Sequence, residues 1–368
     1  MSPATVDEHL RHASSLERSG DWEEALRAYQ QCFREALEVR DVESAVDALR
    51  GGARIRWQQR RYEEGEEMAD LSREIAERNG LAQAAARAIN ILALLRHSQE
   101  DLDGAKHLYR VALERARDTG DDELIGLACQ NLGVIANIQG DLREARVLYL
   151  ESIGSSVRSG HKWNAVSVYN NLGMVCADLQ DWLEAELYFS RGIEIAERIG
   201  DSPLLARLYG NRAEPLIHVG ELFQARETLG RAFEVASRIQ DRGTLADIAR
   251  FRGMIALAEE DLAAAEEHLS HSLALAEESG QELERAEALL VLARLHWLRG
   301  EGDATRAAAR EALEVFRSLG AAADVARAEA LLTGWSRDAT APEVQSLQPT
   351  ERSSFPENPS TGAVQTPP

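Results

Sequence analysis

The sequence predicts an all-α protein built as a solenoid, in which helical hairpins stack one after another. Three observations lead to this fold class. Ala, Leu, Glu and Arg dominate the chain, which is the composition of a largely helical protein. Six of the nine prolines lie after residue 341, so the body of the chain holds few helix breakers. One sequence pattern also recurs every 40 residues between about residues 20 and 320.

The repeat is visible when two segments are set side by side. Residues 129–153 read CQNLGVIANIQGDLREARVLYLESI, and residues 169–193 read YNNLGMVCADLQDWLEAELYFSRGI. Asp141 then falls on Asp181, and Tyr149 falls on Phe189. We call a set of residues that stand 40 apart a column. A single 40-residue hairpin cannot bury its own apolar stripe, so its stability must come from stacking on its neighbours.

Two columns predict how each hairpin packs. Small residues let two helices approach closely, and a bulky residue fills the space that is left. The small column is Ala25, Gly65, Ala105, Ala145, Ala185, Ala225, Ala265 and Thr305. The bulky column, four residues later, is Tyr29, Tyr109, Tyr149, Phe189, Leu229 and Leu269, with Ala69 and Ala309 as weaker members.

Two further columns predict where helices begin and end. Asp can cap a helix N-terminus, and Gly can take the left-handed conformation that closes a helix C-terminus. The Asp column is Asp21, Asp101, Asp141, Asp181 and Asp261. The Gly column is Gly80, Gly120, Gly160, Gly200, Gly280 and Gly320, with Arg40 and Gln240 as exceptions. Each unit is therefore expected to be helix, short turn, helix, short turn.

The unit resembles the tetratricopeptide repeat (TPR). The residues that carry the resemblance are Leu132-Gly133, Ala136, Gly140-Asp141, Ala145, Tyr149 and Ser152. The period of 40 exceeds the usual TPR period of about 34, and Gly replaces the usual closing Pro. This variant resembles the extended arrays of kinesin light chain, the LGN/Pins adaptors, Rap-type bacterial regulators and MalT-like regulators. The resemblance implies a right-handed superhelix whose first helices, the A helices, line a concave groove.

Taken in order, the columns give about eight helical hairpins followed by one more A helix. The first A helix is expected at residues 4–18, and the last near 322–335, where it caps the array. We therefore expect a TPR solenoid over residues 4–335. Residues 336–368 are rich in Pro, Ser and Thr and poor in apolar residues, so they are expected to form a disordered tail.

Composition argues against several kinds of partner and compartment. The formal net charge of -21 at pH 7 disfavours binding to nucleic acid or to an anionic membrane surface. The N-terminus has no apolar core for a signal peptide, and no stretch approaches the length of a membrane span. Three cysteines cannot all pair with one another, so a cytoplasmic location is the natural expectation.

The sequence shows no catalytic motif, and we predict a protein that is not an enzyme and needs no cofactor. A Walker loop, GxGxxG, GxSxG and HExxH are all missing from the sequence. His268 and His271 stand three apart beside Glu267, but two exposed histidines on an outer helix explain this spacing more simply than a metal site. Cys129 and Cys176 are expected to be buried packing residues rather than a redox pair.

If the TPR alignment holds, four columns of the A helices face the concave side, and the fourth of them is Trp57, His97, Asn137, Ala177, Ile217, Leu257 and Trp297. The first is Arg50, Asn90, Gln130, Asn170, Gly210 and Arg250. The second includes Asn131, Asn171, Asn211 and Phe251. The third is Arg54, Leu94, Val134, Met174, Glu214, Met254 and Arg294.

These columns predict a peptide-binding groove. An amide offers a donor and an acceptor, so it can pair with the backbone of an extended peptide. The predicted contacts are Asn90, Asn131, Asn170, Asn171 and Asn211, with Met174 as adaptable apolar surface and Arg250 at the far end. The alternative is that the amides cap or crosslink neighbouring A helices.

Residues 50–62, RGGARIRWQQRRY, are the clearest basic run in the chain. Arg50, Arg54 and Trp57 lie on one helix face, where they could hold a carboxylate and stack a side chain. An acidic peptide is one interpretation, and a solvated helix face is the other. Residues 257–287 are strongly acidic, so the two ends of the array could also associate head to tail in a homo-oligomer.

The sequence therefore predicts a non-catalytic scaffold that binds a peptide or protein segment in its concave groove. A second interpretation is a signal-sensing regulator, like the MalT-like and Rap-type arrays, whose superhelix responds to a small ligand or short peptide. Such a regulator would act through a partner chain. A third interpretation is pure self-assembly through the solenoid ends.

Overall fold

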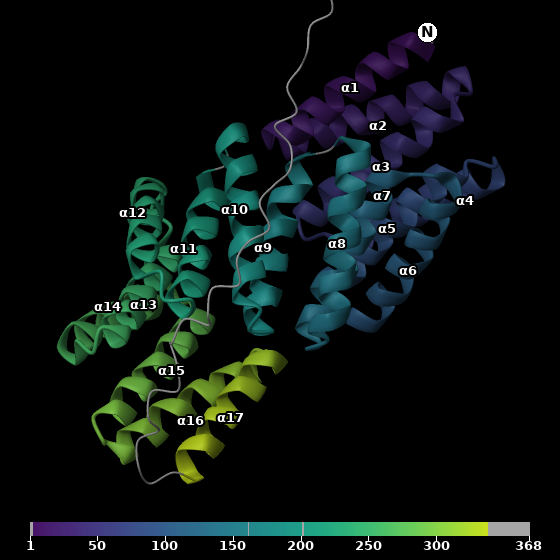
Figure 1. Ribbon diagram of the computed structural model, residues 1–368. Helices are drawn as coiled ribbons and strands as arrows, with labels where there is room; N and C mark the ends of the chain where they lie inside the picture. The colour runs from purple at the N-terminus through teal and green to yellow at the C-terminus, as the bar shows by residue number, and fades with distance from the viewer. Residues whose placement is uncertain (1–2, 161, 201, 338–368) are drawn as a thin grey trace, which may run out of the picture.

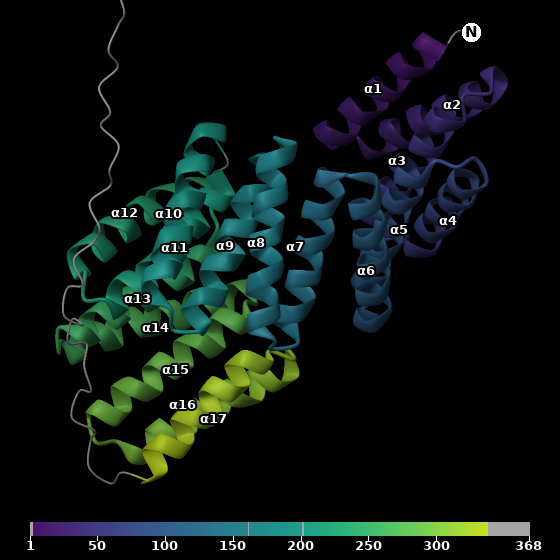
Figure 2. The same cartoon turned by 45° about the vertical axis from the view of Figure 1, so that its right-hand side comes forward.

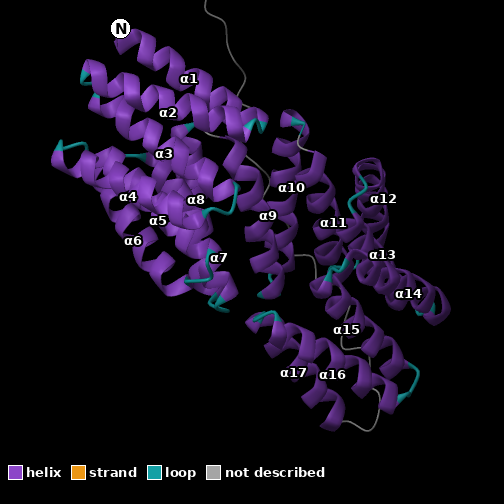
Figure 3. Ribbon diagram, turned by 180° about the vertical axis from the view of Figure 1, so that it is seen from behind, coloured by secondary structure: helices purple, strands orange, loops and turns teal. Residues whose placement is uncertain are grey.

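The computed structural model describes residues 3–160, 162–200 and 202–337, and these residues contain 17 helices and no strand (Figure 3). The helices are α1 (Pro3–Ser19), α2 (Trp22–Val39), α3 (Val42–Gln58), α4 (Tyr62–Arg78), α5 (Ala82–Ser98), α6 (Leu102–Thr119), α7 (Asp122–Ile138), α8 (Leu142–Ser159), α9 (Lys162–Asp178), α10 (Trp182–Ile199), α11 (Ser202–His218), α12 (Leu222–Ile239), α13 (Arg242–Ala258), α14 (Leu262–Ser279), α15 (Glu282–Leu298), α16 (Gly302–Ser318) and α17 (Ala322–Arg337). The predicted all-α solenoid of eight hairpins and a final helix is confirmed.

The helices form two layers along the superhelix. Each helix packs against the next one in the chain, and from α1 to α15 each odd-numbered helix also packs against the following odd-numbered helix. The even-numbered helices make no comparable contacts with one another within the described residues. The odd-numbered A helices therefore lie on the inner, concave layer, and the even-numbered B helices lie on the outer layer (Figure 1).

The packing columns meet inside each hairpin as the sequence predicts. Tyr149 on α8 is 1% exposed and lies against α7 at Gly133, where a Cβ atom would come within 2.6 Å of the Tyr149 ring. Gly173 on α9 faces Phe189 on α10 in the same way, again at 2.6 Å. The Leu-Gly pair in the repeat therefore exists because the ring of the partner helix occupies the space of a side chain.

The helix-ending column has one backbone conformation throughout the described residues. Gly120 and Gly280 have φ angles of 69° and 66°, in the left-handed region. The two exceptions share that conformation without being glycine, with a φ of 60° at Arg40 and 56° at Gln240. The backbone at this column is therefore left-handed even where the residue is not glycine.

The last helix returns to the middle of the chain. α17 packs against α16, and its start lies beside the turn between α7 and α8 (Figure 2). A Cβ atom placed on Gly140 in that turn would lie 3.4 Å from the Cβ of Ala322. α17 is therefore also a wall that faces the inner layer. Of the predicted tail at 336–368, residues 338–368 lie outside the described residues.

None of the helices in the described ranges has the length and apolar character needed to cross a lipid bilayer.

Candidate functional site: two hollows on the concave side

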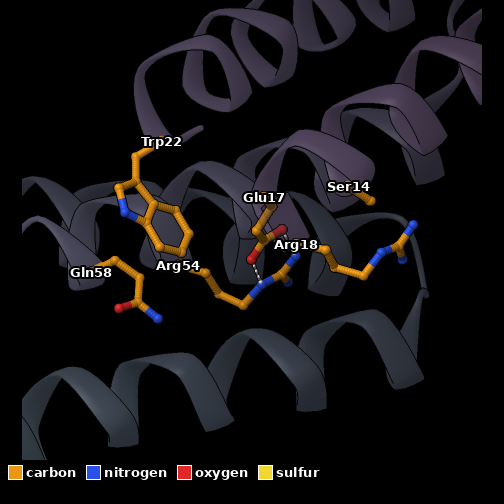
Figure 4. Close-up of a pocket in the computed structure, with 6 residues that line it drawn as sticks. All are labelled: Ser14, Glu17, Arg18, Trp22, Arg54 and Gln58. Carbon is orange, nitrogen blue, oxygen red and sulfur yellow. Dashed lines mark hydrogen bonds and ion pairs between the residues drawn. The ribbon is translucent and has the colours of Figure 1, made fainter. Parts of the chain in front are cut away.

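The first predicted binding residue, Arg54, lies in a hollow near the N-terminus. This N-terminal hollow has a volume of about 350 Å³ and is lined by Ser14, Glu17, Arg18, Trp22, Arg54 and Gln58 (Figure 4). Nε and Nη2 of Arg54 donate to the two carboxylate oxygens of Glu17 at 2.6 and 2.7 Å. Burial alone would raise the pKa of Glu17, but the hydrogen bond and charge of Arg54 outweigh it and lower that pKa.

Most other members of the basic run also have partners within the protein, whereas the exposed Arg60 has no ion pair or side-chain hydrogen bond within the described residues. Arg50 pairs with Asp47 at 2.9 Å, and its side chain is only 13% exposed. The indole of Trp57 donates to Ser98 Oγ at 2.7 Å. Neither Arg50 nor Trp57 lines the N-terminal hollow. The run therefore does not present a cluster of free cations, and its role in holding an acidic peptide stays a prediction.

Three predicted amides lie between helices. Asn170 is 4% exposed, and its Oδ1 accepts a hydrogen bond from Asn211 at 3.1 Å, across α9 and α11. Asn170 Nδ2 also reaches the sulfur of Met174, at 3.4 Å. Asn171 Oδ1 accepts a hydrogen bond from Asn170 Nδ2 at 3.5 Å, within α9. The contact between Asn170 and Asn211 matches the alternative role for the amides, which is to crosslink neighbouring helices.

The two remaining amides differ from these three. Asn131 is half-buried, and Asn90 has a buried Oδ1 without a hydrogen-bond partner in the described structure. No predicted amide is among the residues that line either hollow described here. Their contact with a peptide backbone stays a prediction.

The second hollow lies in the C-terminal half and has a volume of about 270 Å³. We call it the C-terminal cavity. It lies between the ends of α9 and α10 and helices α11, α13, α15 and α17, and its lining residues are Ala177, Asp178, Gln180, Trp182, Glu214, His218, Arg250, Met254, Glu287, Leu290, Val291, Arg294, Arg327 and Leu331. A neighbouring hollow of about 670 Å³ shares some of this lining with it, including Asp178 and Arg327.

Some charges in the C-terminal cavity are compensated by partners. Arg250 is 7% exposed and contacts Asp247 at 2.9 Å and Glu287 at 2.7 Å. Burial alone would lower the pKa of Arg250, but the charges of Glu287 and Asp247 outweigh it and raise that pKa. Arg327 of α17 contacts Asp324 at 2.8 Å. Both guanidiniums are therefore held by the protein itself.

Three other charged groups that line the cavity have no such partner. Asp178, Glu214 and Arg294 make no ion pair or hydrogen bond within the described part of the chain. Loss of solvent raises the pKa of Asp178 to about 7, with Arg327 opposing the shift and Asp324 adding to it. Burial also raises the pKa of Glu214 and lowers that of Arg294. In each case the surroundings disfavour the charged form.

An aromatic pair forms one wall of the cavity. The rings of Trp182 and His218 stack with centroids 3.8 Å apart and an interplanar angle of 7°. Burial, with the charges of Arg294 and Arg327, lowers the pKa of His218 to about 4, so the imidazole is neutral at pH 7. The wall is therefore flat, aromatic and uncharged.

Sequence reasoning found part of this cavity and missed the rest. Arg250 was among the predicted contacts, and Glu214, Met254 and Arg294 stand in the third concave column. Asp178 and the residues of α17 were not singled out, because nothing in the repeat shows that the last helix returns to face the inner layer.

The fold and the stacked hairpins define the class of the protein, an α-solenoid of tetratricopeptide type. The family model described as "Tetratricopeptide repeat" matches residues 164–238, which confirms the resemblance seen in the sequence. Comparison with curated proteins found no match.

The solved structures that share this fold include the following three. A signal-transduction ATPase with a tetratricopeptide repeat sensor from Pyrococcus horikoshii is 15% identical, with a TM-score of 0.60 over 91% of this chain and 55% of that one. The apo quorum sensor NprR from B. thuringiensis is 15% identical, with a TM-score of 0.56 over 84% of this chain and 87% of that one. The Rap conjugation gene regulator of plasmid pLS20, in complex with the Phr* peptide, is 12% identical, with a TM-score of 0.51 over 86% of this chain and 97% of that one. At these identities the likeness is one of fold.

Proposed function

We propose that this protein is a non-catalytic binding protein that holds a peptide or protein segment on its concave side, chiefly in the C-terminal cavity. One observation carries the proposal. Glu214, Met254 and Arg294 belong to one column on α11, α13 and α15, and all three line the same cavity. Stacked repeats thus present successive side chains to one ligand, which suits an extended chain.

The character of the lining supports a peptide rather than a flat surface contact. The cavity combines aliphatic residues such as Leu290 and Val291 with a few charged groups, the mixture found in ligand sites. Its volume of about 270 Å³ suits a few side chains, and the neighbouring hollow gives a chain room to continue. A protein of the same fold has been solved in complex with the Phr* peptide.

The cysteines favour binding over nucleophilic catalysis. Cys32, Cys129 and Cys176 are free and buried. Burial raises the pKa of the Cys32 thiol to about 11 and those of Cys129 and Cys176 to about 12. A thiol with such a pKa is a poor nucleophile at neutral pH, because the thiolate is the reactive form.

A regulatory role is the second candidate, and the position of α17 favours it. Arg327 and Leu331 of α17 line the cavity, while α17 packs mainly on α16. A ligand that contacts both α17 and the inner layer would favour the closed arrangement of these parts. This role makes the protein a sensor whose closure is read by a partner chain. Self-association through the solenoid ends stays a prediction, which light scattering over a concentration range tests.

A cavity-filling variant tests the proposed function. The purified protein is immobilised and exposed to a degenerate pool of N-acetylated decapeptides, and retained peptides are quantified by mass spectrometry. Met254→Trp should fill the cavity and reduce retention at least tenfold. Phe223→Trp is the matched control, since Phe223 is 80% exposed on α12, outside the cavity.

Each outcome of this experiment decides a separate point. Retention by the wild type and the control but not by Met254→Trp supports the proposal. Equal retention by all three would show that peptides bind elsewhere. If no peptide is retained by the wild type, the peptide-binding function itself is wrong.

A further inference from the structure

The C-terminal cavity contains charges that the protein leaves uncompensated. Asp178 and Glu214 face it from α9 and α11, and Arg294 faces it from α15. By contrast, Arg250 and Arg327 in the same cavity each contact at least one carboxylate. Glu214 is half-buried, and Asp178 and Arg294 keep contact with solvent, so all three charges are available to a ligand in the cavity.

The uncompensated charges form two poles. Asp178 and Glu214 belong to one electrostatic group, in which Glu287 and Asp324 act on each carboxylate as like charges and Arg327 as an opposite charge. Arg250 is a further opposite charge on Glu214. Arg294 is not among the main charges that act on either carboxylate, and together with Arg327 it acts on His218, the residue that stacks on Trp182. One pole is therefore acidic, and the other is a guanidinium beside an aromatic wall.

Apolar surface accompanies the two poles. Met254, Leu290 and Val291 line the cavity on α13 and α15. Leu331 adds an aliphatic side chain from α17. A ligand that reached both poles would therefore have to be apolar over part of its length.

We propose that the C-terminal cavity selects a dipolar segment, with a lysine or arginine side chain beside Asp178 and Glu214 and a carboxylate on Arg294, joined by apolar residues. This inference rests on the proposed function and names the chemistry of its ligand. A cation at the acidic pole compensates two carboxylates that have no partner, and a carboxylate does the same for the guanidinium. The net charge of -21 adds long-range attraction for the basic end.

The proposal also assigns a direction to the ligand. The guanidinium of Arg294 can donate two parallel hydrogen bonds to a carboxylate, which fixes the orientation of the ligand as well as its charge. Arg54 stands in the same column, but its guanidinium already makes a bidentate pair with the carboxylate of Glu17. The selective site is therefore in the C-terminal half, although both halves carry an arginine at this position.

Four peptide pools test the proposal. Each is an N-acetylated hexapeptide with a degenerate centre of Leu, Val, Met and Ala. The first residue is Lys or its uncharged analogue norleucine, and the C-terminus is a free carboxylate or an amide. Dissociation constants are measured by calorimetry against the full chain. Removing either the ammonium or the carboxylate should weaken binding at least tenfold, and removing both should weaken it further.

Isosteric variants assign each charge to its pole. In the double variant Asp178→Asn, Glu214→Gln, the effect of Lys should fall below threefold while the effect of the carboxylate persists. In Arg294→Gln the pattern should reverse. Glu114→Gln on α6 and Arg143→Gln on α8 are matched controls, because both residues are exposed and lie outside the cavity. Circular dichroism and thermal melting confirm that each variant is folded.

Proton linkage gives a second readout. The pKa of Asp178 is raised to about 7, so part of its population is protonated at neutral pH. A cation that binds beside Asp178 should release protons, which makes the binding enthalpy at pH 7 depend on the ionisation enthalpy of the buffer. The dependence should weaken in Asp178→Asn.

The outcomes separate this inference from the function on which it rests. If all four pools bind equally and Met254→Trp abolishes binding, the cavity binds peptides but the dipolar selection is wrong. If the charge effects appear but survive unchanged in the cavity variants, the poles are misassigned. If no pool binds while the decapeptides are retained, the dipolar selection is again wrong. If no peptide of either kind binds, both proposals fail.

Discussion

The two halves of the solenoid use the same columns in different ways. Arg54 on α3 and Arg294 on α15 occupy one column, yet Arg54 is held by Glu17 and Arg294 has no carboxylate within reach in the described structure. Arg50 and Arg250 occupy another column. Arg50 contacts one acid, whereas Arg250 contacts two and is 7% exposed. The N-terminal half compensates its concave charges, and the C-terminal half leaves several of them open.

This difference shows that membership of a column determines the direction of a side chain but not the residues that it contacts. In the N-terminal half, Glu17 of α1 reaches over to the next A helix and takes up the guanidinium of Arg54. In the C-terminal half, α17 brings Arg327 and Leu331 to face α9, α11 and α13. The repeat therefore determines which positions face the concave side. The residues at the two ends of the array determine which of the charged side chains at those positions are paired.

The largest expected effect comes from the column that contains Arg50 and Arg250. Arg250→Gln leaves the half-buried carboxylates of Asp247 and Glu287 without the guanidinium that pairs with both, and we expect a loss of about 3 kcal/mol of local stability. Arg50→Gln leaves only Asp47, whose side chain is 33% exposed, and should cost about 1 kcal/mol. Hydrogen exchange read by mass spectrometry reports α13 and α3 separately, since repeats can open locally. Equal losses would remove this contrast between the halves.

The column of Arg54 and Arg294 should give the next largest difference. Arg54→Gln breaks a bidentate pair and leaves the half-buried Glu17 without its partner, so we expect a loss of about 2 kcal/mol. Arg294→Gln removes a guanidinium that has no partner, so stability should be unchanged or slightly higher. Urea denaturation of the two variants measures this. A comparable loss in Arg294→Gln would show that Arg294 has a structural partner and would weaken the proposed carboxylate pole.

The fold follows from the sequence because its signal is repeated. Small residues such as Ala145, ring residues such as Tyr149 and helix-ending glycines stand in phase along the array. Each of these three columns corresponds to one requirement of packing or backbone geometry, and successive units of the structure meet it. The Asp column is less uniform, because Asp101, Asp141 and Asp261 cap a helix through the side chain and Asp21 and Asp181 do not. A sequence pattern that recurs in many units is easy to identify. This explains why the hairpins, their order and the capping helix could be predicted.

The candidate site was predicted only in part because it depends on contacts between columns. The sequence places Asn170 and Asn211 on the concave side, but it does not show that their amides reach each other across two helices. Nor does it show that Glu17 takes up Arg54 from 37 residues away. Such pairings depend on side-chain length and on the curvature of the superhelix, which no single repeat encodes.

The two halves should also respond to pH with opposite signs. The pKa of Asp178 is raised from 3.8 to about 7, so its contribution to stability falls as the pH rises from about 4 to 7 and is constant above that. Asp178→Asn should match the wild type near pH 4 and exceed its stability above pH 7. The gain should be about 1 kcal/mol or less, because the carboxylate is partly exposed and its shift is discounted for solvent screening.

Glu17 supplies the opposite case. Its pKa is lowered below the ordinary value of 4.5, so its contribution is present at neutral pH and is lost as the pH falls below about 4.5. Glu17→Gln should therefore be less stable than the wild type at pH 7 and approach it in acid. Thermal melts of both variants between pH 3 and pH 8 test this pair. If the stability difference from the wild type had the same sign at pH 7 in both variants, the assignment of Glu17 as compensated and Asp178 as uncompensated would be wrong.

The smallest expected effect should be the same in both halves. Arg40 and Gln240 end α2 and α12 in the left-handed conformation, with exposed side chains, where the same column elsewhere has glycine. Replacing either by Gly relieves the Cβ clash of that conformation, partly offset by the greater freedom of Gly in the unfolded chain, for a net gain of about 0.5–1 kcal/mol. Gly280→Ala should lose about 1 kcal/mol for the same reason. Chemical denaturation should give equal gains for Arg40→Gly and Gln240→Gly, because the backbone at this column depends on the repeat alone. Unequal gains would mean that the two halves differ in the stability of their turns as well as in the pairing of their charged side chains.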